Sequence, residues 1–321
     1  MTVLVTGAGL IACHSAKALL KRGERVVFYD LSSSEEYIQF VLEGAAYEFE
    51  QGDILDLPNL IDVAKKHDVN GLVHTAAFLP ERAAKQPALA AQVNVIGAVN
   101  LFELHRIASL RRTVFISTIG IFDQNQEDGH AWEEDHLLGP DTIYGCTKLS
   151  AELIGLHYAK AYGVDLVSLR FSPVFGIGNY YTSPAGTFIR DVLEPAALTG
   201  ASEIRREFSN TNQYLYALDA GEAVALAFEL NENPDTRVFN ISEGCLRTAN
   251  EVVELAEKAI PNAKISIQNA AWEASKDRHF VTEPFSLHSA NHVLGFKPSW
   301  PMDKAFKDYA EQVRRRANKT L

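Results

Sequence analysis

A tyrosine and a lysine stand four residues apart in the segment DTIYGCTK, residues 141–148. Residues four apart share one face of a helix, so the phenol of Tyr144 and the ammonium of Lys148 would be neighbours. A nearby cation favours the phenolate and lowers a tyrosine pKa that is usually about 10. Such a tyrosine can exchange a proton with an alcohol. The spacing also arises by chance, with the tyrosine packed and the lysine in solvent, so other features must decide.

A glycine-rich turn opens the chain in the segment VLVTGAGLIAC. The pattern predicts a strand, a tight turn at Gly7 and Gly9, and a helix that starts near Leu10 and Ile11. Free backbone N–H groups at such a helix start can bind a pyrophosphate. The spacing G-x-G-x-x-A is not decisive alone, but its place between a strand and a helix is the context that a dinucleotide site requires.

Acidic residues follow the second and third predicted strands. Asp30, about 20 residues after the glycine turn, can accept hydrogen bonds from the adenosine ribose and would repel a 2′-phosphate, which favours NAD over NADP. The alternative is that Asp30 only caps a turn. Asp53 is placed to bond the adenine amino group, with Ile54 as apolar cover.

The fifth predicted strand ends in VFISTIGIF. The carboxyl ends of strands in a parallel sheet face the crevice in which ligands bind. Ser117 and Thr118 are therefore placed to offer a hydroxyl to a reacting oxygen. The alternative is that two polar residues simply end a buried strand.

The elements that position these residues alternate in type along the first half of the chain. Predicted strands cover residues 2–6, 25–29, 47–51, 71–75, 113–118 and 165–170, and predicted helices cover residues 10–21, 57–67, 87–109 and 142–162. Such alternation predicts an α/β fold of the Rossmann type, with a doubly wound parallel sheet and helices on both faces.

The regular alternation of predicted strands and helices ends after Phe171. We expect helices at residues 187–198 and 219–230, strands at 214–217 and 238–241, and a capping box from Thr248 to Glu251 before another helix. This predicts an NAD-binding domain of residues 1–172 plus about 213–241. A smaller α/β substrate-binding lobe would hold about 173–212 plus 242–321.

Composition narrows the classes of function. The 321 residues carry a net charge of −11, which argues against a nucleic-acid or anionic-membrane binder. Three scattered cysteines and ten histidines show no metal-like spacing, so no metal site is expected. We see no signal peptide and no apolar run of the roughly 20 residues that span a bilayer, so a cytoplasmic protein is expected.

Taken in order, these segments resemble an extended short-chain dehydrogenase/reductase, the NAD-dependent epimerase/dehydratase family, over essentially the whole chain. The matching segments are TGAGLIA, Asp30, GDI at 52–54, HTAA at 74–77, NVIGAVNLFE at 94–103, STIGIF, YGCTK, LRFSPVFG, YALDAGEAVALAFE and LGFKP.

That resemblance implies roles for individual residues. Thr118 would hold the substrate oxygen, Tyr144 would exchange the proton, and Lys148 would also bond the nicotinamide ribose of NAD. Asn94 would support the active-site backbone. The remaining implied cofactor contacts are Ala76, Ala77 and Phe171. The helices at 87–109 and 141–162 resemble a pair that often forms a dimer interface in this family, which implies a homodimer.

Departures from the family pattern bear on the substrate. Pro173 and Asn212 stand where nucleotide-sugar enzymes of the family carry an asparagine and an arginine, which argues against a diphosphate. Arg205 and Arg206 lie nearby and would supply the missing charge. Ile119 and Gly120 replace the Asp-Glu pair of the dehydratases. A small carbohydrate-type substrate remains, with Phe78, Thr118, Tyr144, Tyr180 and Arg190 as its expected contacts.

Three hypotheses follow. The first is an NAD-dependent dehydrogenase that acts on a secondary alcohol of a sugar, sugar acid, lactone or polyol. The alternative is a redox-neutral sugar or nucleotide-sugar epimerase that keeps NAD tightly bound. The third, a non-catalytic NAD-binding regulator, is disfavoured by the intact Thr–Tyr–Lys set.

Overall fold

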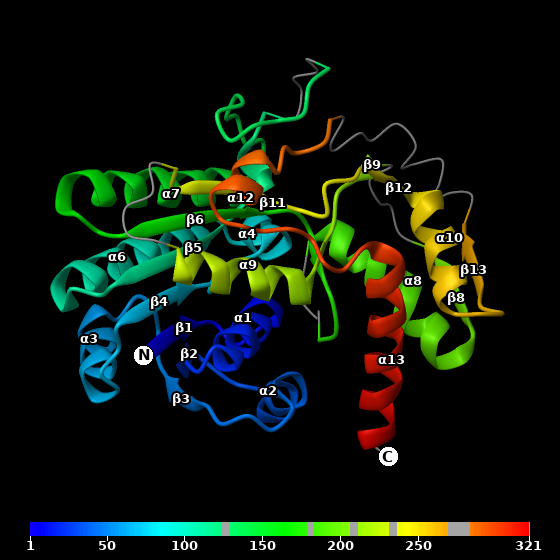
Figure 1. The fold of residues 1–321 in the computed structure, drawn as a ribbon, viewed down its shortest axis with the longest axis horizontal. Coiled ribbons are helices and arrows are strands. Elements are labelled where there is room, and N and C mark those ends of the chain that lie inside the picture. The colour runs from blue at the N-terminus through cyan, green and yellow to red at the C-terminus, as the bar shows by residue number, and fades with distance from the viewer. Residues whose placement is uncertain (124–128, 179–182, 206–210, 231–235, 269–282, 321) are drawn as a thin grey trace.

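A computed structural model describes residues 1–123, 129–178, 183–205, 211–230, 236–268 and 283–320 (Figure 1). Its centre is a seven-stranded sheet in the order β3-β2-β1-β4-β5-β6-β11, and every neighbouring pair is parallel. The strands are β1 (Thr2–Thr6), β2 (Arg25–Asp30), β3 (Glu48–Gln51), β4 (Gly71–His74), β5 (Arg112–Thr118), β6 (Leu166–Phe171) and β11 (Val238–Ile241). The predicted Rossmann-type fold is confirmed, and its strand order reverses between β1 and β4, where such sheets bind ligands.

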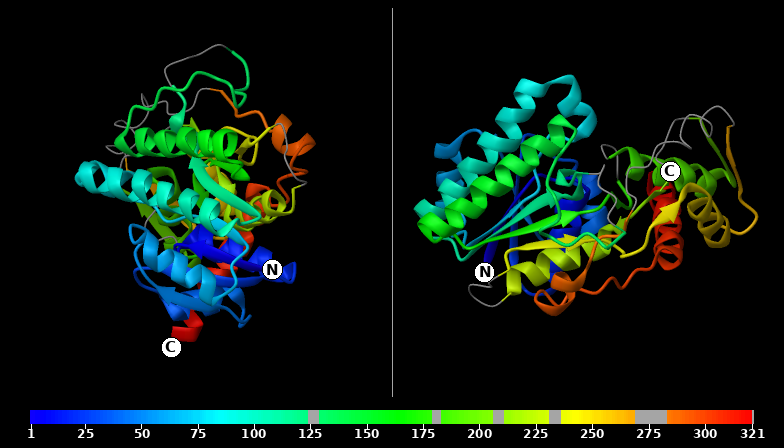
Figure 2. Two further views of the ribbon diagram at one scale, coloured as in Figure 1. Left: turned by 90° about the vertical axis from the view of Figure 1, so that its left-hand side faces the viewer. Right: turned by 90° about the horizontal axis from the view of Figure 1, so that it is seen from above.

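Helices cover both faces of the sheet (Figures 1 and 2). Helices α3 (Leu57–Lys66), α6 (Gly97–Ala108) and α7 (Ile143–Tyr162) lie on one face, and α1 (Leu10–Lys21) and α9 (Ala217–Glu229) lie on the other. Every residue of β6 is buried, which explains its near-continuous apolar sequence. Helices α1 and α9 approach closely at Gly221, where an added Cβ would lie 2.3 Å from the backbone oxygen of His14.

Helix α2 (Glu35–Leu42) was not expected from the sequence. The side chain of Ser34 caps it by accepting a hydrogen bond from the Tyr37 backbone N–H. The Tyr37 hydroxyl then donates to the Ile177 carbonyl at 3.0 Å. This helix is fixed by contacts with a distant segment, which local periodicity does not report.

The C-terminal part of the chain builds a second group of elements beside the carboxyl ends of the strands (Figure 1, right). It contains α8 (Pro184–Thr199), α10 (Ala249–Ala259), α13 (Met302–Thr320), and the parallel pair β8 (Ala201–Ile204) and β13 (Lys264–Ile267). The predicted capping box between Thr248 and Glu251 is confirmed. The division into a cofactor domain and a substrate lobe remains a prediction.

One expectation about the strands was wrong in its pairing. The strand near Tyr214 is the two-residue β10 (Leu215–Tyr216), which pairs with β7 (Val174–Phe175) instead of joining the main sheet. Another short pair joins β9 (Thr211–Asn212) to β12 (Arg247–Thr248). Among the described residues after Phe171, only β11 returns to the central sheet.

The helical run Pro87–Ala108 is long and apolar enough, by length and composition alone, to cross a membrane, although no such run was expected. It comprises α5 (Pro87–Ala91), a π-helical turn (Gln92–Ile96) and α6. Its inner face packs against α3, α7 and the sheet, and 39% of the apolar window is buried. Core helices pass the same test, so this finding is weak evidence for a membrane.

Candidate active site

The glycine turn forms an open cradle at the carboxyl end of β1. Gly7 has φ +89°, and a Cβ there would meet Thr75 Oγ1 at 2.7 Å and the Ala76 backbone nitrogen at 3.2 Å. A Cβ at Gly9 would meet nothing within 4 Å. Gly9 is also the N-cap of α1, and it has no side chain that could cap the first N–H groups of that helix. The cradle therefore fits a pyrophosphate.

Asp30 lies beside this cradle. Its Oδ2 accepts a hydrogen bond from the Ala8 backbone N–H at 2.8 Å, which ties the end of β2 to the turn. Asp53 makes a local turn in which its Oδ1 accepts from the Leu55 N–H at 2.9 Å. Ile54 is buried, and a Cβ at Gly97 would lie 2.5 Å from its Cδ1, so its side chain packs against α6. Its role as apolar cover for the adenine remains a prediction.

Thr118 and Tyr144 meet at the carboxyl end of β5. Their hydroxyls hydrogen-bond to each other, and Thr118 Oγ1 also accepts from the Gly120 N–H at 3.1 Å. Adjacent residues of a strand point to opposite faces, and the neighbouring Ser117 hydroxyl is buried without a partner among the described residues. Of the two predicted hydroxyls, only Thr118 is brought to the tyrosine.

The expected fall in the tyrosine pKa is not found in this structure. Burial raises the pKa of Tyr144 to about 12, and the hydrogen bond with Thr118 only partly opposes this rise. Burial also lowers the pKa of Lys148 to about 7, against the attraction of Glu152. Because both groups are desolvated, each favours its uncharged form, and sequence spacing does not reveal this competition.

Lys148 lies in an aromatic and largely uncharged environment. Its Nζ is 4.1 Å from the centre of the Phe115 ring. The buried His74 is a neighbour on β4, where burial first and the charge of Lys148 second hold the His74 pKa well below its usual value. His74 Nδ1 lies 2.8 Å from Thr6 Oγ1, so the imidazole is fixed to β1.

Asn94 occupies the π-helical turn and supports the segment after β4. Its Oδ1 accepts from the Phe78 N–H at 2.7 Å, and its Nδ2 donates to the Phe78 carbonyl at 3.1 Å and to Thr147 Oγ1 at 3.0 Å. A π-turn inside a helix shifts the side chains that follow, and such turns often mark functional sites. Asn94 thereby joins the chain beyond Ala76 and Ala77 to the helix that carries Tyr144.

Three further residues predicted to contact the substrate (Phe78 and Arg190) or the cofactor (Phe171) can be placed in the structure. Phe78 packs in one apolar cluster with Tyr144, and Phe171 is buried at the end of β6. Arg190 pairs with its neighbour Asp191 at 2.9 Å on α8, and its contact with a substrate remains a prediction. Tyr180 lies outside the described residues.

The positions tied to a diphosphate can be examined in the same way. Pro173 follows β6, and the Asn212 side chain is buried, with its Oδ1 accepting from the Gln213 N–H at 3.0 Å. Arg205 pairs with Glu203 at 2.7 Å and is 72% exposed. Arg206 lies outside the described residues.

In the acidic loop of residues 133–135, which precedes Tyr144, Glu134 is held by two strands of the sheet. Its Oε1 accepts from the Asn240 N–H of β11 at 2.9 Å, and its carbonyl accepts from Arg170 Nη1 at 2.6 Å. The sequence holds no local signal for this, since the partners lie on distant strands. In the described part of the chain, no group of three or more His, Cys, Asp or Glu side chains could hold a metal ion.

Comparison with known proteins now identifies the family. The model of the NAD dependent epimerase/dehydratase family matches residues 3–242. The chain belongs to this family. The expected resemblance is thereby confirmed, and NAD is the cofactor, as in solved relatives that contain it.

Two curated relatives show the range of similarity. UDP-glucose 4-epimerase of Lacticaseibacillus casei is 28% identical, covering 94% of this chain and 92% of its own length. UDP-glucuronate 4-epimerase 2 of Arabidopsis thaliana is 26% identical, covering 96% of this chain and 75% of its own length.

Solved structures share the fold. UDP-glucose 4-epimerase of Thermotoga maritima superposes with a TM-score of 0.82 at 24% identity, over 98% of this chain and 99% of that one. L-threonine dehydrogenase of Clostridium difficile gives 0.82 at 23% identity, over 98% of both chains. Epimerases and dehydrogenases therefore use the same scaffold, and the fold alone does not separate them.

Proposed function

We propose that this chain is an NAD-dependent epimerase that inverts a secondary alcohol of a carbohydrate-type substrate without net oxidation. The observation that carries the proposal is the Thr118–Tyr144 hydrogen bond next to Lys148, at the strand edge that also holds the glycine cradle. The two curated relatives named above are 4-epimerases of UDP-sugars, which supports epimerisation over the net dehydrogenation that the sequence alone put first.

The side chains divide the work in the proposed reaction. The Thr118 hydroxyl holds the substrate oxygen, and the Tyr144 hydroxyl exchanges the proton of that oxygen. Lys148 bonds the nicotinamide ribose, the open cradle at Gly9 receives the pyrophosphate, and Asp30 accepts from the adenosine ribose. Bound NAD would supply the hydride acceptor and donor that inversion at the alcohol carbon without net oxidation requires.

The protonation states of Tyr144 and Lys148 suit the step in which the substrate oxygen regains its proton. With its pKa near 12, Tyr144 holds its proton at neutral pH and can donate it to a developing alkoxide. For the forward step, added positive charge beside the phenol lowers that pKa again. Lys148, with a pKa near 7, can supply this charge at neutral pH.

A second candidate is a dehydrogenase of a small sugar, sugar acid, lactone or polyol. It is favoured by the lack of obvious diphosphate ligands at two positions, because Pro173 has no side-chain donor and Asn212 is buried and bonded locally. Arg205, which would supply the missing charge, pairs with Glu203 at an exposed position.

One incubation separates the candidates. The purified protein is incubated with NAD⁺ and, in parallel, with UDP-glucose, UDP-glucuronate and a panel of free sugars, sugar acids and polyols, while NADH and isomer composition are followed. We expect an isomer without accumulated NADH. NADH formed in step with an oxidised product would support the dehydrogenase instead. Bound NAD with neither product on any substrate would contradict both.

A further inference from the structure

Helix α7 carries a carboxylate that the mechanism above does not use. Glu152 stands one helical turn after Lys148 and has no exposed surface. Residues four apart lie on one face of a helix, so this carboxylate lies on the same face of α7 as the lysine, and its charge acts on the Lys148 pKa. A charged group without contact to water is costly unless it is paired and hydrogen-bonded. Its surroundings therefore need an explanation.

Both oxygens of this carboxylate are held from β6. Arg170 Nη2 lies 2.7 Å and Nε 3.2 Å from Oε1, and the Ser168 hydroxyl donates to Oε2 at 2.7 Å. Arg170 is itself buried and donates to the Glu134 carbonyl. Such a two-pronged contact fixes the orientation of the carboxylate as well as its charge.

This arrangement is more than packing requires. A buried ion pair is often no more stabilising than apolar residues of similar volume, so its presence is weak evidence for a purely structural role. Glu152 also stands four residues after Lys148, the lysine that is expected to bind the cofactor. The pair also joins α7 to β6 and to the acidic loop, so the position of the lysine is linked to both.

The groups around Lys148 come from four elements. Its own helix supplies Tyr144 and Glu152, β4 supplies the neutral His74, β5 supplies the Phe115 ring, and β6 supplies Arg170 behind Glu152. Among the described residues, Glu152 is the charge that opposes the effect of burial on the Lys148 pKa. Tyr144 is protonated, so it contributes no negative charge at neutral pH.

We propose that Glu152, held by Arg170 and Ser168, is a positioning residue whose fixed negative charge retains and orients the ammonium of Lys148 toward NAD. The proposal rests on the role given to Lys148 in the proposed function. Its test uses cofactor binding alone, so it remains decisive even if no sugar substrate is found.

The experiment measures the affinity of the nucleotide-free protein for NADH by fluorescence between pH 6 and pH 9. The ammonium form of Lys148 binds the ribose hydroxyls, so affinity falls as pH rises through the Lys148 pKa. In Glu152→Gln we expect this fall to move to lower pH by about one unit, the size typical of losing one close opposite charge. Lys148→Met should abolish this fall in affinity, which would assign the fall to the titration of Lys148.

Two further variants separate positioning from folding. The double variant Glu152→Gln/Arg170→Met removes both members of the ion pair and leaves no unpaired buried charge, so it should fold. Its NADH affinity should still fall at a lower pH than in the wild type. Glu152→Asp keeps the charge and should restore the wild-type midpoint. Wild-type pH dependence in both the single and the double glutamine variants would overturn the proposal, whatever the sugar assays show.

Discussion

At the scale of single residues, the proposed chemistry depends on the hydroxyl of Tyr144. Tyr144→Phe keeps the ring in its apolar cluster with Phe78, Ala83 and Ala90 and removes only the proton carrier. We expect turnover to fall by about 10²–10⁴-fold, the usual contribution of a positioned acid or base. Steady-state assays on the substrate that the panel identifies provide the measurement. Unchanged turnover would contradict the role, and an unchanged melting curve serves as the control for folding.

Residue spacing predicted which residues form much of this site, but it did not predict how deeply their side chains are buried. The positions of Thr118, Tyr144 and Lys148 on one strand and the next helix can be read from order and spacing. The raised pKa of Tyr144 and the lowered pKa of Lys148 come from burial, which depends on every element packed around them. The Glu152–Arg170 pair was equally hidden, because its members meet only once α7 lies on β6.

At the scale of elements, cofactor binding depends on how α1 is held. Gly221 of α9 lets the two helices approach, since an added Cβ would lie 2.3 Å from the His14 backbone oxygen. Gly221→Ala should therefore push α1 away, cost about 3 kcal/mol of stability and weaken NADH binding. Urea unfolding and fluorescence titration test this.

The neighbouring Glu222→Ala variant is the matched control. It loses only a partly exposed ion pair with Arg22, with an expected cost of about 1 kcal/mol or less. Equal stability of the Gly221 and Glu222 variants would show that the close approach of α1 and α9 is not needed.

Elements with a strong local signal were the predictable ones. The limits of α1 and β11 match the sequence expectation, because an alternating or continuous apolar pattern with clear glycine or polar boundaries defines them. The pairing of β7 with β10 and the π-turn at Asn94 have no such pattern. Both are set by contacts between distant segments, as is the hydrogen bond from the Tyr37 hydroxyl of α2 to the Ile177 carbonyl.

At the scale of the whole molecule, one surface stands out for its apolar character. Six of the eleven large exposed apolar side chains among the described residues lie on the run Pro87–Ala108 or on α7, namely Leu89, Ile96, Ile107, Ile143, Leu153 and Tyr162. An apolar outer face also explains why that run resembles a membrane span. Such a surface on a folded domain marks an interaction site.

We predict that this surface forms a homodimer. Light scattering at micromolar concentration should give twice the chain mass of 35.4 kDa. Leu153→Asp, at a position that is 52% exposed, should shift the mass toward the monomer without unfolding the chain. Leu198→Asp is the control, since Leu198 is equally exposed but lies on α8. A monomeric wild-type mass would remove the prediction.

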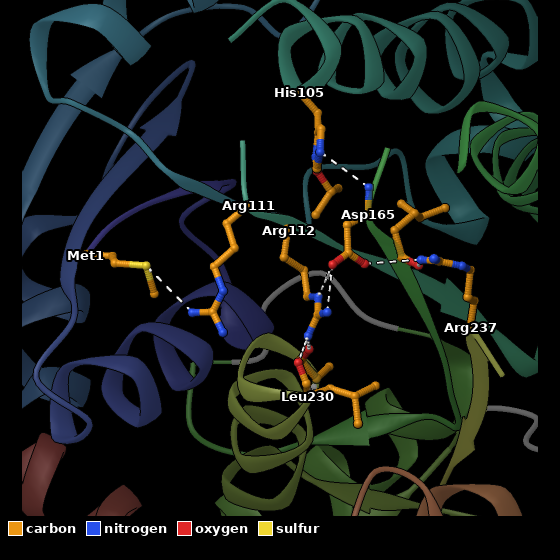
Figure 3. Close-up of polar contacts among 10 residues, drawn as sticks. Met1, His105, Arg111, Arg112, Asp165, Leu230 and Arg237 are labelled. Atoms are coloured by element: carbon orange, nitrogen blue, oxygen red, sulfur yellow. Dashed lines mark hydrogen bonds and ion pairs between the residues drawn. The ribbon is translucent and has the colours of Figure 1, made fainter. Parts of the chain in front are cut away.

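A polar network lies at the amino ends of β5 and β6, at the opposite end of these strands from the proposed chemistry (Figure 3). Asp165 pairs with Arg112 at 2.7 Å and with Arg237 at 3.1 Å, and its backbone N–H donates to His105 Nε2 at 3.3 Å. Arg112 also donates to the carbonyls of Ala227 and Leu230 at the end of α9. This network ties α6, β5, β6 and α9 together.

Two buried histidines make the whole fold sensitive to acid. Burial lowers the pKa of His105 and of His14 from 6.5 to about 4, so both are neutral in the folded chain. The unfolded chain binds their protons at about pH 6.5. Between about pH 6.5 and pH 4 the unfolded state therefore holds more protons, and stability falls as pH falls, by up to about 3 kcal/mol for each histidine. Above pH 6.5 their contribution is complete and constant. Urea unfolding at pH 7 and pH 5 measures this loss of stability. His105→Gln, which cannot titrate, should reduce it. If the difference between the two unfolding free energies is unchanged in that variant, His105 is excluded as a source of the loss.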